Sequence, residues 1–286
     1  MKKILCVSAV AFMLATTFTS CKKAALETTD VANTGGLSGS EKSLIKAAGF
    51  DASWAAKQAD GRFLIEEDIL LSTDQLNEMA GVTPAYELVF PNQEHYRTTN
   101  LVNTNGGVRT LDITLGASFP AYYATALNNV IAKYNALNLN IRFRKVSAVT
   151  ATSLDIVAAN LGGPNAQGGI TLGQSQGFPS GGQPAFGFTI TTNSQAAFAF
   201  NTVAKVEIVM QHELGHNIGF RHTDYINRAS CGAGSTGEGQ AGVGALQIPG
   251  TPGTVAGSYS SFMMACNGSN PLAFTAADIT ALNYVY

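Results

Sequence analysis

The chain has 286 residues and a formal net charge of -2, and 45% of its residues are hydrophobic whereas only 13% are charged. This length and composition suffice for a full-sized core and exclude a polyelectrolyte. The sequence has no basic stripe that would follow a phosphate backbone, so we expect no nucleic-acid partner.

The first residues, MKKILCVSAVAFMLATTFTSC, begin with two lysines and continue as an apolar run, as a secretory signal peptide does. The small residues before Cys21 resemble the lipobox of bacterial lipoproteins, whose cysteine becomes the acylated first residue of the mature chain. We expect a signal peptide at 1–20, lipidation of Cys21 and a polar spacer at 21–40. Ordinary cleavage is the alternative. The protein would then be exported, either to the bacterial cell envelope, with membrane contact through the anchor, or to the extracellular space.

Export determines how the cysteines are interpreted. Cys6 lies in the signal peptide and Cys21 at the processing site, so that Cys231 and Cys266 remain in the folded part. An oxidising compartment favours a disulfide bond between these two cysteines, and two free buried thiols are the alternative.

Residues 41–105 form an N-terminal segment in which the sequence SEKSLIKAAGF predicts a short helix. The acidic and apolar stretch GRFLIEEDILLSTDQLNEMA follows, and nothing in the segment looks catalytic. Its place before an exported domain suggests a propeptide. A small accessory layer of the same fold is an equal alternative.

From residue 106 onward the pattern predicts an α+β domain. TLDITL alternates apolar and polar residues as a half-buried strand does, and a helix beginning at Pro120 has one apolar stripe up to Leu137. IRFRKVS, SLDIVAAN, GITLGQ and PAFGFTIT are further predicted strands. The stretch 162–187 is rich in Gly and Pro but has no phosphate-binding pattern, so it is expected to form loops around its strands.

The sequence HELGHNIGFRH, residues 212–222, places three of the four histidines of the chain within eleven positions. Asn201 is a plausible N-cap for the helix that leads into it. On a helix, His212 and His216 lie on one face and reach the same ion, whereas Glu213 points about 100° away. Gly219 permits the left-handed conformation that ends a helix and turns the chain back, so that His222 becomes the third ligand.

Three neutral imidazoles leave one position of a tetrahedral zinc ion open for water, as catalytic sites require. Glu213 is then the base that activates the zinc-bound water for attack on a peptide carbonyl. His95 is the one histidine outside the motif, and we expect it to be an ordinary surface or propeptide residue.

The motif resembles the signature of the metzincin metallopeptidases, HExxHxxGxxH followed by a Met-turn. The sequence SYSSFMMACNG provides the second half, with Met263 as the hydrophobic floor of the zinc site and Met264 as the alternative. Ala265 stands where astacins and serralysins have a tyrosine, so no tyrosine ligand is expected. The run HELGHNIGFRHTD and the ending FTAADITALNYVY are most similar to the bacterial dual-action HEIGH metallopeptidases, although Leu214 replaces isoleucine. In the ending, Thr275 is a predicted N-cap with Asp278 as its capping-box partner.

The resemblance implies a metzincin-like catalytic domain with a twisted mixed sheet, two main helices and a C-terminal helix. It also implies that an antiparallel edge strand, near 169–174, pairs with an extended peptide substrate. Asp224 would orient the loop below the site, or is a plain turn residue. The low-complexity loop 231–258 would build the primed-side pocket, restrained by the proposed disulfide, and its one acidic residue, Glu238, gives no support to a calcium site.

We therefore expect an exported, lipid-anchored zinc metalloendopeptidase that holds one catalytic ion, acts on peptides or proteins and is a monomer. If the N-terminal segment inhibits, an acidic group among Glu66, Glu67 and Asp68 would reach the metal. The alternatives are a cell-surface binding lipoprotein with a structural metal and a different zinc hydrolase built on the same helix. The presence of Glu213 disfavours the first, and Gly219 with His222 disfavours the second.

Overall fold

The computed structural model describes residues 36–81, 95–165, 168–232, 237–239, 242–252, 260–266 and 270–286. The predicted signal peptide, Cys21 and most of the predicted spacer lie outside these residues. Within these ranges, no helix combines the length and the apolar character needed to cross a membrane.

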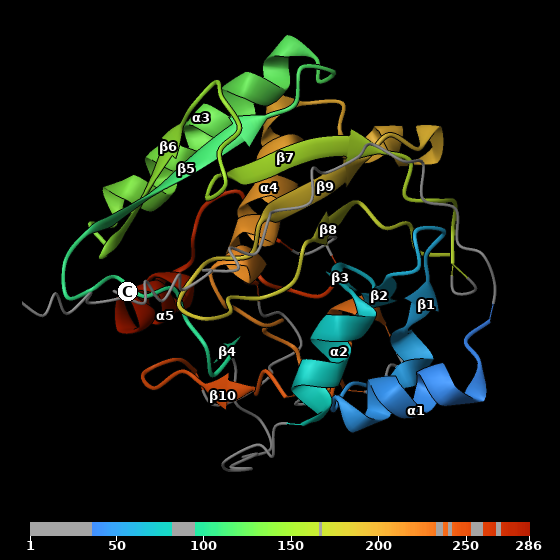
Figure 1. Ribbon diagram of the computed structural model, residues 1–286. Coiled ribbons are helices and arrows are strands. Elements are labelled where there is room, and N and C mark those ends of the chain that lie inside the picture. Colours follow the sequence, from blue (N-terminus) through green and yellow to red (C-terminus); the bar gives the residue numbers. More distant parts are fainter. Residues whose placement is uncertain are drawn as a thin grey trace, which may run out of the picture.

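An eight-stranded mixed sheet organises the molecule, with the strand order β1-β2-β3-β8-β9-β7-β5-β6 (Figure 1). Strands β5, β6, β7 and β9 run parallel to one another, whereas β8 is antiparallel to β9. The bounds are β1 (Ala56–Lys57), β2 (Phe63–Ile65), β3 (Ile69–Leu71), β5 (Arg109–Leu115), β6 (Ile141–Lys145), β7 (Leu154–Ala159), β8 (Gly173–Ser175) and β9 (Gly187–Thr191).

Two helices, α3 (Ala121–Ala136) and α4 (Val203–Asn217), pack against each other and cover one face of this sheet (Figure 1). The predicted apolar stripe of α3 is buried, and the predicted strand, helix, strand, strand order is confirmed. Two caps differ by one residue from the prediction. Pro120 is the N-cap of α3 and not its first residue, and Thr202 replaces Asn201 as the N-cap of α4 because its hydroxyl accepts from the Lys205 amide.

The lower part of the molecule contains the C-terminal helix α5 (Ala276–Val285) and a two-stranded sheet of β4 (Tyr96–Arg97) and β10 (Leu246–Gln247). The capping box predicted at the start of α5 is present: Thr275 accepts from the Asp278 amide, and Asp278 accepts from the Thr275 amide. Three short 3-10 helices complete the described elements: η1 (Ala52–Trp54), η2 (Ser194–Ala199) and η3 (Ala229–Cys231). The α+β fold class with a mixed sheet and a C-terminal helix is confirmed.

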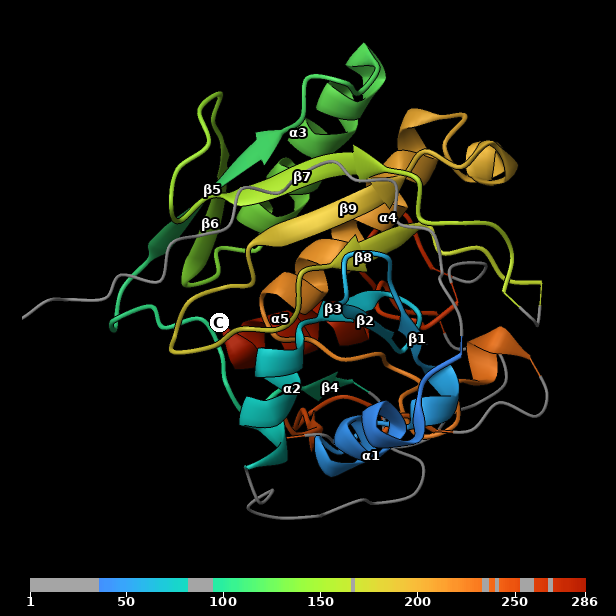
Figure 2. The same ribbon diagram turned by 45° about the vertical axis from the view of Figure 1, so that its right-hand side comes forward.

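The N-terminal segment adds helices α1 (Gly39–Ala47) and α2 (Thr73–Ala80) and three strands beyond β8 (Figure 2). It has its own hydrophobic cluster, which includes Ile45, Phe63, Ile69 and Leu76 and takes in Phe178 and Val243 from the rest of the chain. The predicted edge strand is therefore not an edge here. β8 is antiparallel, as expected, but β3 pairs with it in parallel through Ile69 and Ser175.

His95 is not a surface residue, because only 1% of it is exposed. Its Nε2 lies 2.8 Å from Asp278 Oδ1, and the Ser261 hydroxyl donates to the same carboxylate oxygen over 2.6 Å. This buried group joins the start of α5 to the segment that carries Met263. The expectation of a surface residue was wrong, because no local pattern around His95 indicates contacts with residues more than 160 positions away.

Candidate active site

Helix α4 places two of the motif histidines at one point. His212 and His216 lie one turn apart, and their Nε2 atoms are 3.1 Å from each other. The helix ends at Asn217, and Gly219 then adopts a φ of +104°. A Cβ at this glycine would lie 2.9 Å from Thr98 Oγ1 and strain the backbone. The reversal brings His222 Nε2 to 3.2 Å from His216 Nε2.

Every motif histidine has its other ring nitrogen fixed. His212 Nδ1 donates to the Phe262 carbonyl over 2.9 Å, and His216 Nδ1 donates to the Phe220 carbonyl over 2.8 Å. His222 Nδ1 lies 2.5 Å from Glu238 Oε1. Because the carbonyls only accept, the protons of His212 and His216 are on Nδ1, and the carboxylate favours the same tautomer in His222. In this tautomer the three Nε2 lone pairs converge on one point, where a metal ion could bind.

The donor set fits zinc. Tetrahedral ligands at zinc–nitrogen distances of about 2.0–2.1 Å lie roughly 3.3 Å apart, close to the separations found here. Three imidazoles and no thiolate are a donor set that zinc accepts in hydrolytic sites. The residues present therefore fit the metal that the motif predicts, and the structure brings all three predicted ligands together.

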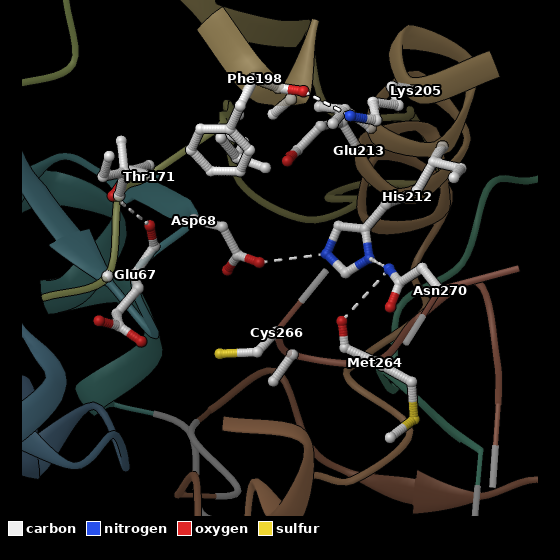
Figure 3. A pocket seen from close by; sticks show the side chains of 18 of the residues that line it. Glu67, Asp68, Thr171, Phe198, Lys205, His212, Glu213, Met264, Cys266 and Asn270 are labelled. Atoms are coloured by element: carbon white, nitrogen blue, oxygen red, sulfur yellow. Dashed lines mark hydrogen bonds and ion pairs between the residues drawn. The ribbon is translucent and has the colours of Figure 1, made fainter. Parts of the chain in front are cut away.

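Glu213 points from α4 into the same space (Figure 3). A Cβ on Gly173 of β8 would lie 2.2 Å from Glu213 Oε1, so glycine at this position makes room for the carboxylate. Burial raises the pKa of the Glu213 carboxyl well above its usual range, and the negative charge of Asp68 adds to the shift. Its Oε2 is buried and has no hydrogen-bond partner among the described residues. A carboxylate so placed is suited to accept a proton.

Met263 lies under the histidines, as predicted for the Met-turn. It is fully buried, and its Sδ would be only 2.3 Å from a Cβ at Gly215, the helix residue between His212 and His216. Met264 instead lines the cavity beside the site. The geometry thus assigns the floor position to Met263.

An aspartate of the N-terminal segment faces the three histidines where a fourth metal ligand would lie. Asp68 Oδ2 lies 2.7 Å from His222 Nε2, 3.2 Å from His212 Nε2 and 3.3 Å from His216 Nε2. Its carbonyl accepts from the Ser175 amide of β8 over 2.7 Å. Burial opposes ionisation, but the histidines hold the pKa of Asp68 well below its usual range. Of the three acidic residues considered in the sequence, Asp68 is the one that reaches the metal position.

Asp68 ends a three-residue hairpin loop between β2 and β3, and the two residues before it have unusual backbones. Glu66 has a φ of 54° and Glu67 a φ of 71°, a region that residues other than glycine rarely adopt. Side-chain contacts offset this cost. Arg221 donates to Glu66, and Arg228 donates to Glu67 over 2.6 Å. Burial raises the pKa of Glu66 to about 8, although Arg221 opposes the shift.

Glu238 is a site residue that sequence reasoning missed. Besides holding His222, its Oε1 accepts from Arg228 over 2.7 Å. Burial would raise its pKa, but His222 and the two arginines outweigh burial and lower the pKa to about 2. A carboxylate that orients a metal-binding histidine through Nδ1 is a common supporting contact. The only sequence signal was that Glu238 is the single acidic residue in an otherwise neutral loop.

A cavity of about 550 Å³ opens beside the histidines, above the Met-turn (Figure 3). Its walls come from the hairpin tip, the strand rim 169–173, α4 and the residues after Met263. The loop 231–258, which was predicted to build the pocket, contributes none of its described residues to the lining of this cavity. That part of the chain instead contributes β10, which pairs with β4.

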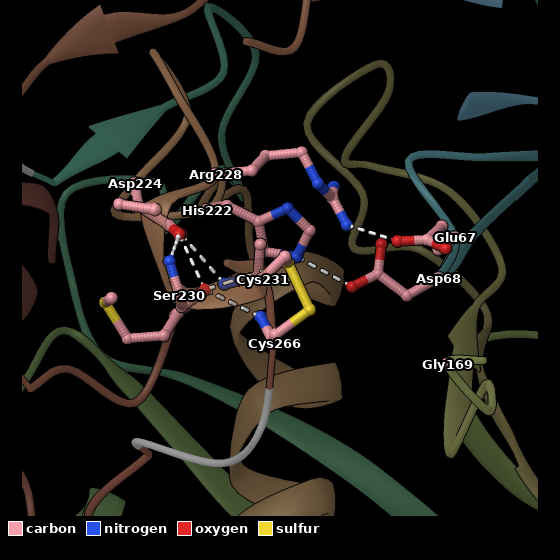
Figure 4. The surroundings of a disulfide bond; sticks show 12 residues. Glu67, Asp68, Gly169, His222, Asp224, Arg228, Ser230, Cys231 and Cys266 are labelled. Carbon is pink, nitrogen blue, oxygen red and sulfur yellow. Dashed lines mark hydrogen bonds and ion pairs between the residues drawn. A yellow bond between two sulfur atoms is a disulfide. The ribbon is translucent and has the colours of Figure 1, made fainter. Parts of the chain in front are cut away.

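The predicted disulfide between Cys231 and Cys266 is confirmed (Figure 4). Asp224 acts beside it: its Oδ1 accepts from the Ala265 amide over 2.9 Å, and its Oδ2 accepts from the Ser230 amide over 2.9 Å. Asp224 thus joins the loop after the third histidine to the Met-turn, which favours the loop-orienting role over a plain turn.

A search of the solved structures finds a hatching-enzyme zinc protease of the medaka fish Oryzias latipes, High choriolytic enzyme 1, at 13% identity and a TM-score of 0.35, covering 65% of this chain and 92% of that chain. It also finds myroilysin at 14% identity and a TM-score of 0.32, covering 72% of this chain and 88% of that chain. A search of the curated proteins finds no match.

A family model gives the assignment. The model of the dual-action HEIGH metallo-peptidases matches residues 63–286, which is more than half of the chain and includes both the hairpin with Asp68 and the histidine motif. The prediction of a metallopeptidase is confirmed, and the chain belongs to the family of dual-action HEIGH metallopeptidases.

Proposed function

We propose that the protein is a zinc endopeptidase in which His212, His216 and His222 hold one zinc ion and Glu213 is the general base. The observation that carries this proposal is the convergence of three Nε2 lone pairs whose opposite ring nitrogens are fixed. When bound, zinc supplies Lewis-acid chemistry, which polarises a carbonyl and acidifies water.

The residues of the chain would transfer the proton and orient the peptide substrate. Glu213 takes a proton from the attacking water and passes it to the leaving amine. The peptide lies extended against β8, where the Ser175 amide, which now donates to Asp68, is available to a substrate carbonyl. This backbone contact and the cavity beside α4 would then orient the scissile bond.

We propose further that the described conformation is latent. Asp68 takes the position where a substrate carbonyl and water must enter, and β3 covers the strand that would bind the substrate. Hydrolysis therefore requires the hairpin to leave the cleft, by cleavage of the N-terminal segment or by its displacement.

Export and lipid anchoring remain part of the proposal and rest on the sequence of the first residues. Labelling of expressing cells with a fatty-acid analogue tests the anchor. We expect label on the wild-type protein and none on Cys21→Ala; label that survives this substitution would contradict the assignment.

The peptidase proposal is tested with a broad peptide library and the zinc-loaded protein from which the N-terminal segment has been cleaved. Removal of zinc should abolish cleavage, and Glu213→Ala should lower kcat/KM by about 10²–10⁴-fold, the usual contribution of a general base. If zinc is bound but cleavage does not exceed that of Glu213→Ala, the protein is a metal-containing binding protein instead.

Latency is tested on the intact chain. Asp68→Ala should raise its zinc-dependent activity at least about tenfold, since breaking a contact worth 1.4 kcal/mol already has that effect. Asp74→Ala, an exposed aspartate at the start of α2, is the matched control and should leave the intact chain at the wild-type level. An intact wild-type chain as active as the cleaved protein would contradict latency.

A further inference from the structure

The Glu67 carboxylate is bound by side-chain donors on both of its oxygens, as a bound carboxylate molecule would be. The Arg228 guanidinium donates to Oε2 over 2.6 Å, and the Asn165 side-chain amide donates to Oε1. The Thr171 hydroxyl also donates to the Glu67 carbonyl over 3.2 Å. Figure 4 shows the Arg228 and Glu67 side chains meeting close to Asp68. Charge-assisted contacts of this kind are stronger and more directional than neutral hydrogen bonds.

Both donors keep contacts outside the hairpin, although Arg228 also donates to the Glu66 carbonyl of the hairpin over 3.2 Å. Arg228 has no exposed side-chain surface and also donates to Glu238, a residue of the catalytic part of the chain. The side-chain oxygen of Asn165 accepts from the Gly169 backbone amide over 2.8 Å. The backbone amide of Asn165 donates to the Gly169 carbonyl, also over 2.8 Å. The two donors are therefore organised by contacts that remain when Glu67 leaves.

Activation would make the net charge of the cleft more positive. Glu66, Glu67 and Asp68 leave with the hairpin, whereas Arg221 and Arg228 stay with Glu238 between them. Lys205 lines the far side of the same cavity, where it donates to the Phe198 carbonyl. A cleft that has lost three carboxyl groups and keeps its cations favours an anionic occupant.

The location fixes which part of a substrate would enter. Glu67 directly precedes Asp68, whose carboxylate lies where a fourth metal ligand would bind. A scissile carbonyl that replaces Asp68 therefore places neighbouring side chains within reach of Arg228 and Asn165. Glu67 itself lines the cavity beside α4.

We propose that Arg228 and Asn165 form a substrate subsite for an Asp or Glu side chain within two residues of the scissile bond, which Glu67 fills in the latent protein. The proposal rests on the proposed peptidase function and adds a substrate class to it, namely acidic peptides. Arg228 and Asn165 are its specificity-determining residues.

The first test needs no catalysis and uses the full chain. In Glu67→Gly the carboxylate is removed, and glycine suits the positive φ at this position. Propionate has the chemistry of the missing side chain, so it should raise the melting temperature of zinc-loaded Glu67→Gly, whereas propionamide and sodium chloride should not. Wild-type protein, whose site is filled, should show no such rise, and Arg228→Gln added to Glu67→Gly should abolish it.

The second test uses matched peptides that differ only in Glu or Gln near the scissile bond, with the cleaved, zinc-loaded protein. We expect kcat/KM to be about ten- to a hundredfold higher for the Glu peptide, because a site built to bind a polar group rejects an analogue without it. Asn165→Asp keeps the acceptor for Gly169 but adds a negative charge. It should remove most of this preference and leave the Gln peptide little affected.

Asn160→Asp is the charge control, because Asn160 lies on the same loop but outside the cavity lining. It should keep the preference for the Glu peptide. A failure of propionate to stabilise Glu67→Gly beyond propionamide would overturn the carboxylate site. If propionate binds but Glu213-dependent cleavage has the same kcat/KM for the Glu and Gln peptides, the proposed substrate preference is overturned. Propionate binding without any Glu213-dependent cleavage would instead overturn the peptidase function, and with it the acidic-substrate proposal.

Discussion

At the scale of single residues, the site is determined by what holds each ligand as much as by the ligands. His212 and His216 are fixed by backbone carbonyls, but His222 depends on the Glu238 carboxylate. Glu238 in turn is held by Arg228. A carboxylate partner fixes the ring orientation and raises the basicity of the metal-binding nitrogen.

We therefore expect Glu238→Gln to lower zinc affinity by about 10–100-fold, because the amide keeps the shape but loses the charge that favours the proper tautomer. Competition with a zinc chelator measures this. Asp112→Asn, which alters a carboxylate paired with Arg144 at the surface, is the control and should bind zinc as the wild type does. Equal affinities of Glu238→Gln and Asp112→Asn would show that Glu238 has no role in holding the metal.

At the scale of elements, the close packing of α4 against the Met-turn fixes the position of the histidine motif over Met263. Gly215 lies in the interior of α4, where alanine would ordinarily stabilise a helix by about 0.8–1 kcal/mol. Here the added Cβ would lie 2.3 Å from Met263 Sδ and 2.8 Å from the Phe262 ring. The overpacking cost of about 1–3 kcal/mol is larger than the gain in propensity.

Gly215→Ala should thus destabilise the protein by about 1–2 kcal/mol, as measured by urea unfolding of the zinc-free and zinc-loaded forms. Adding Met263→Ala provides space for the methyl group, so the double variant should be less unstable than the sum of the two single variants. Strict additivity would mean that the two residues do not press on each other.

At the scale of the whole molecule, the N-terminal segment extends the same sheet that the catalytic part builds. The Ser175 amide donates to Asp68 across β3 and β8, whereas the Gln176 amide donates to Gly187 within the catalytic part. The two amides are neighbours in sequence, but one donates to the hairpin and the other donates to the catalytic part of the sheet. Their exchange rates therefore report separately on the hairpin and on the sheet.

Removal of the segment should speed hydrogen exchange of the Ser175 amide at least about tenfold, because this amide loses its acceptor, the Asp68 carbonyl, and becomes open to solvent. The Gln176 amide should keep its protection. Exchange measured by nuclear magnetic resonance resolves the two. Equal acceleration at both amides would indicate that the sheet itself loosens.

The sequence by itself determined the local features of this protein. The four-residue spacing of His212 and His216, the turn at Gly219 and the capping box of α5 follow from helix geometry and backbone sterics, and the structure has all three. The pairing of Cys231 with Cys266 followed from the predicted export, which left no other cysteines for the folded part.

Only the tertiary structure decided how distant parts meet. The sequence named three acidic candidates without distinguishing them, and Asp68 is the one that the β2–β3 hairpin brings to histidines 144 or more positions away. Glu238, the buried His95 and the covering of β8 by β3 were missed. Periodicity and caps report on neighbours along the chain, whereas these contacts depend on how the sheet and loops pack, which no short pattern records.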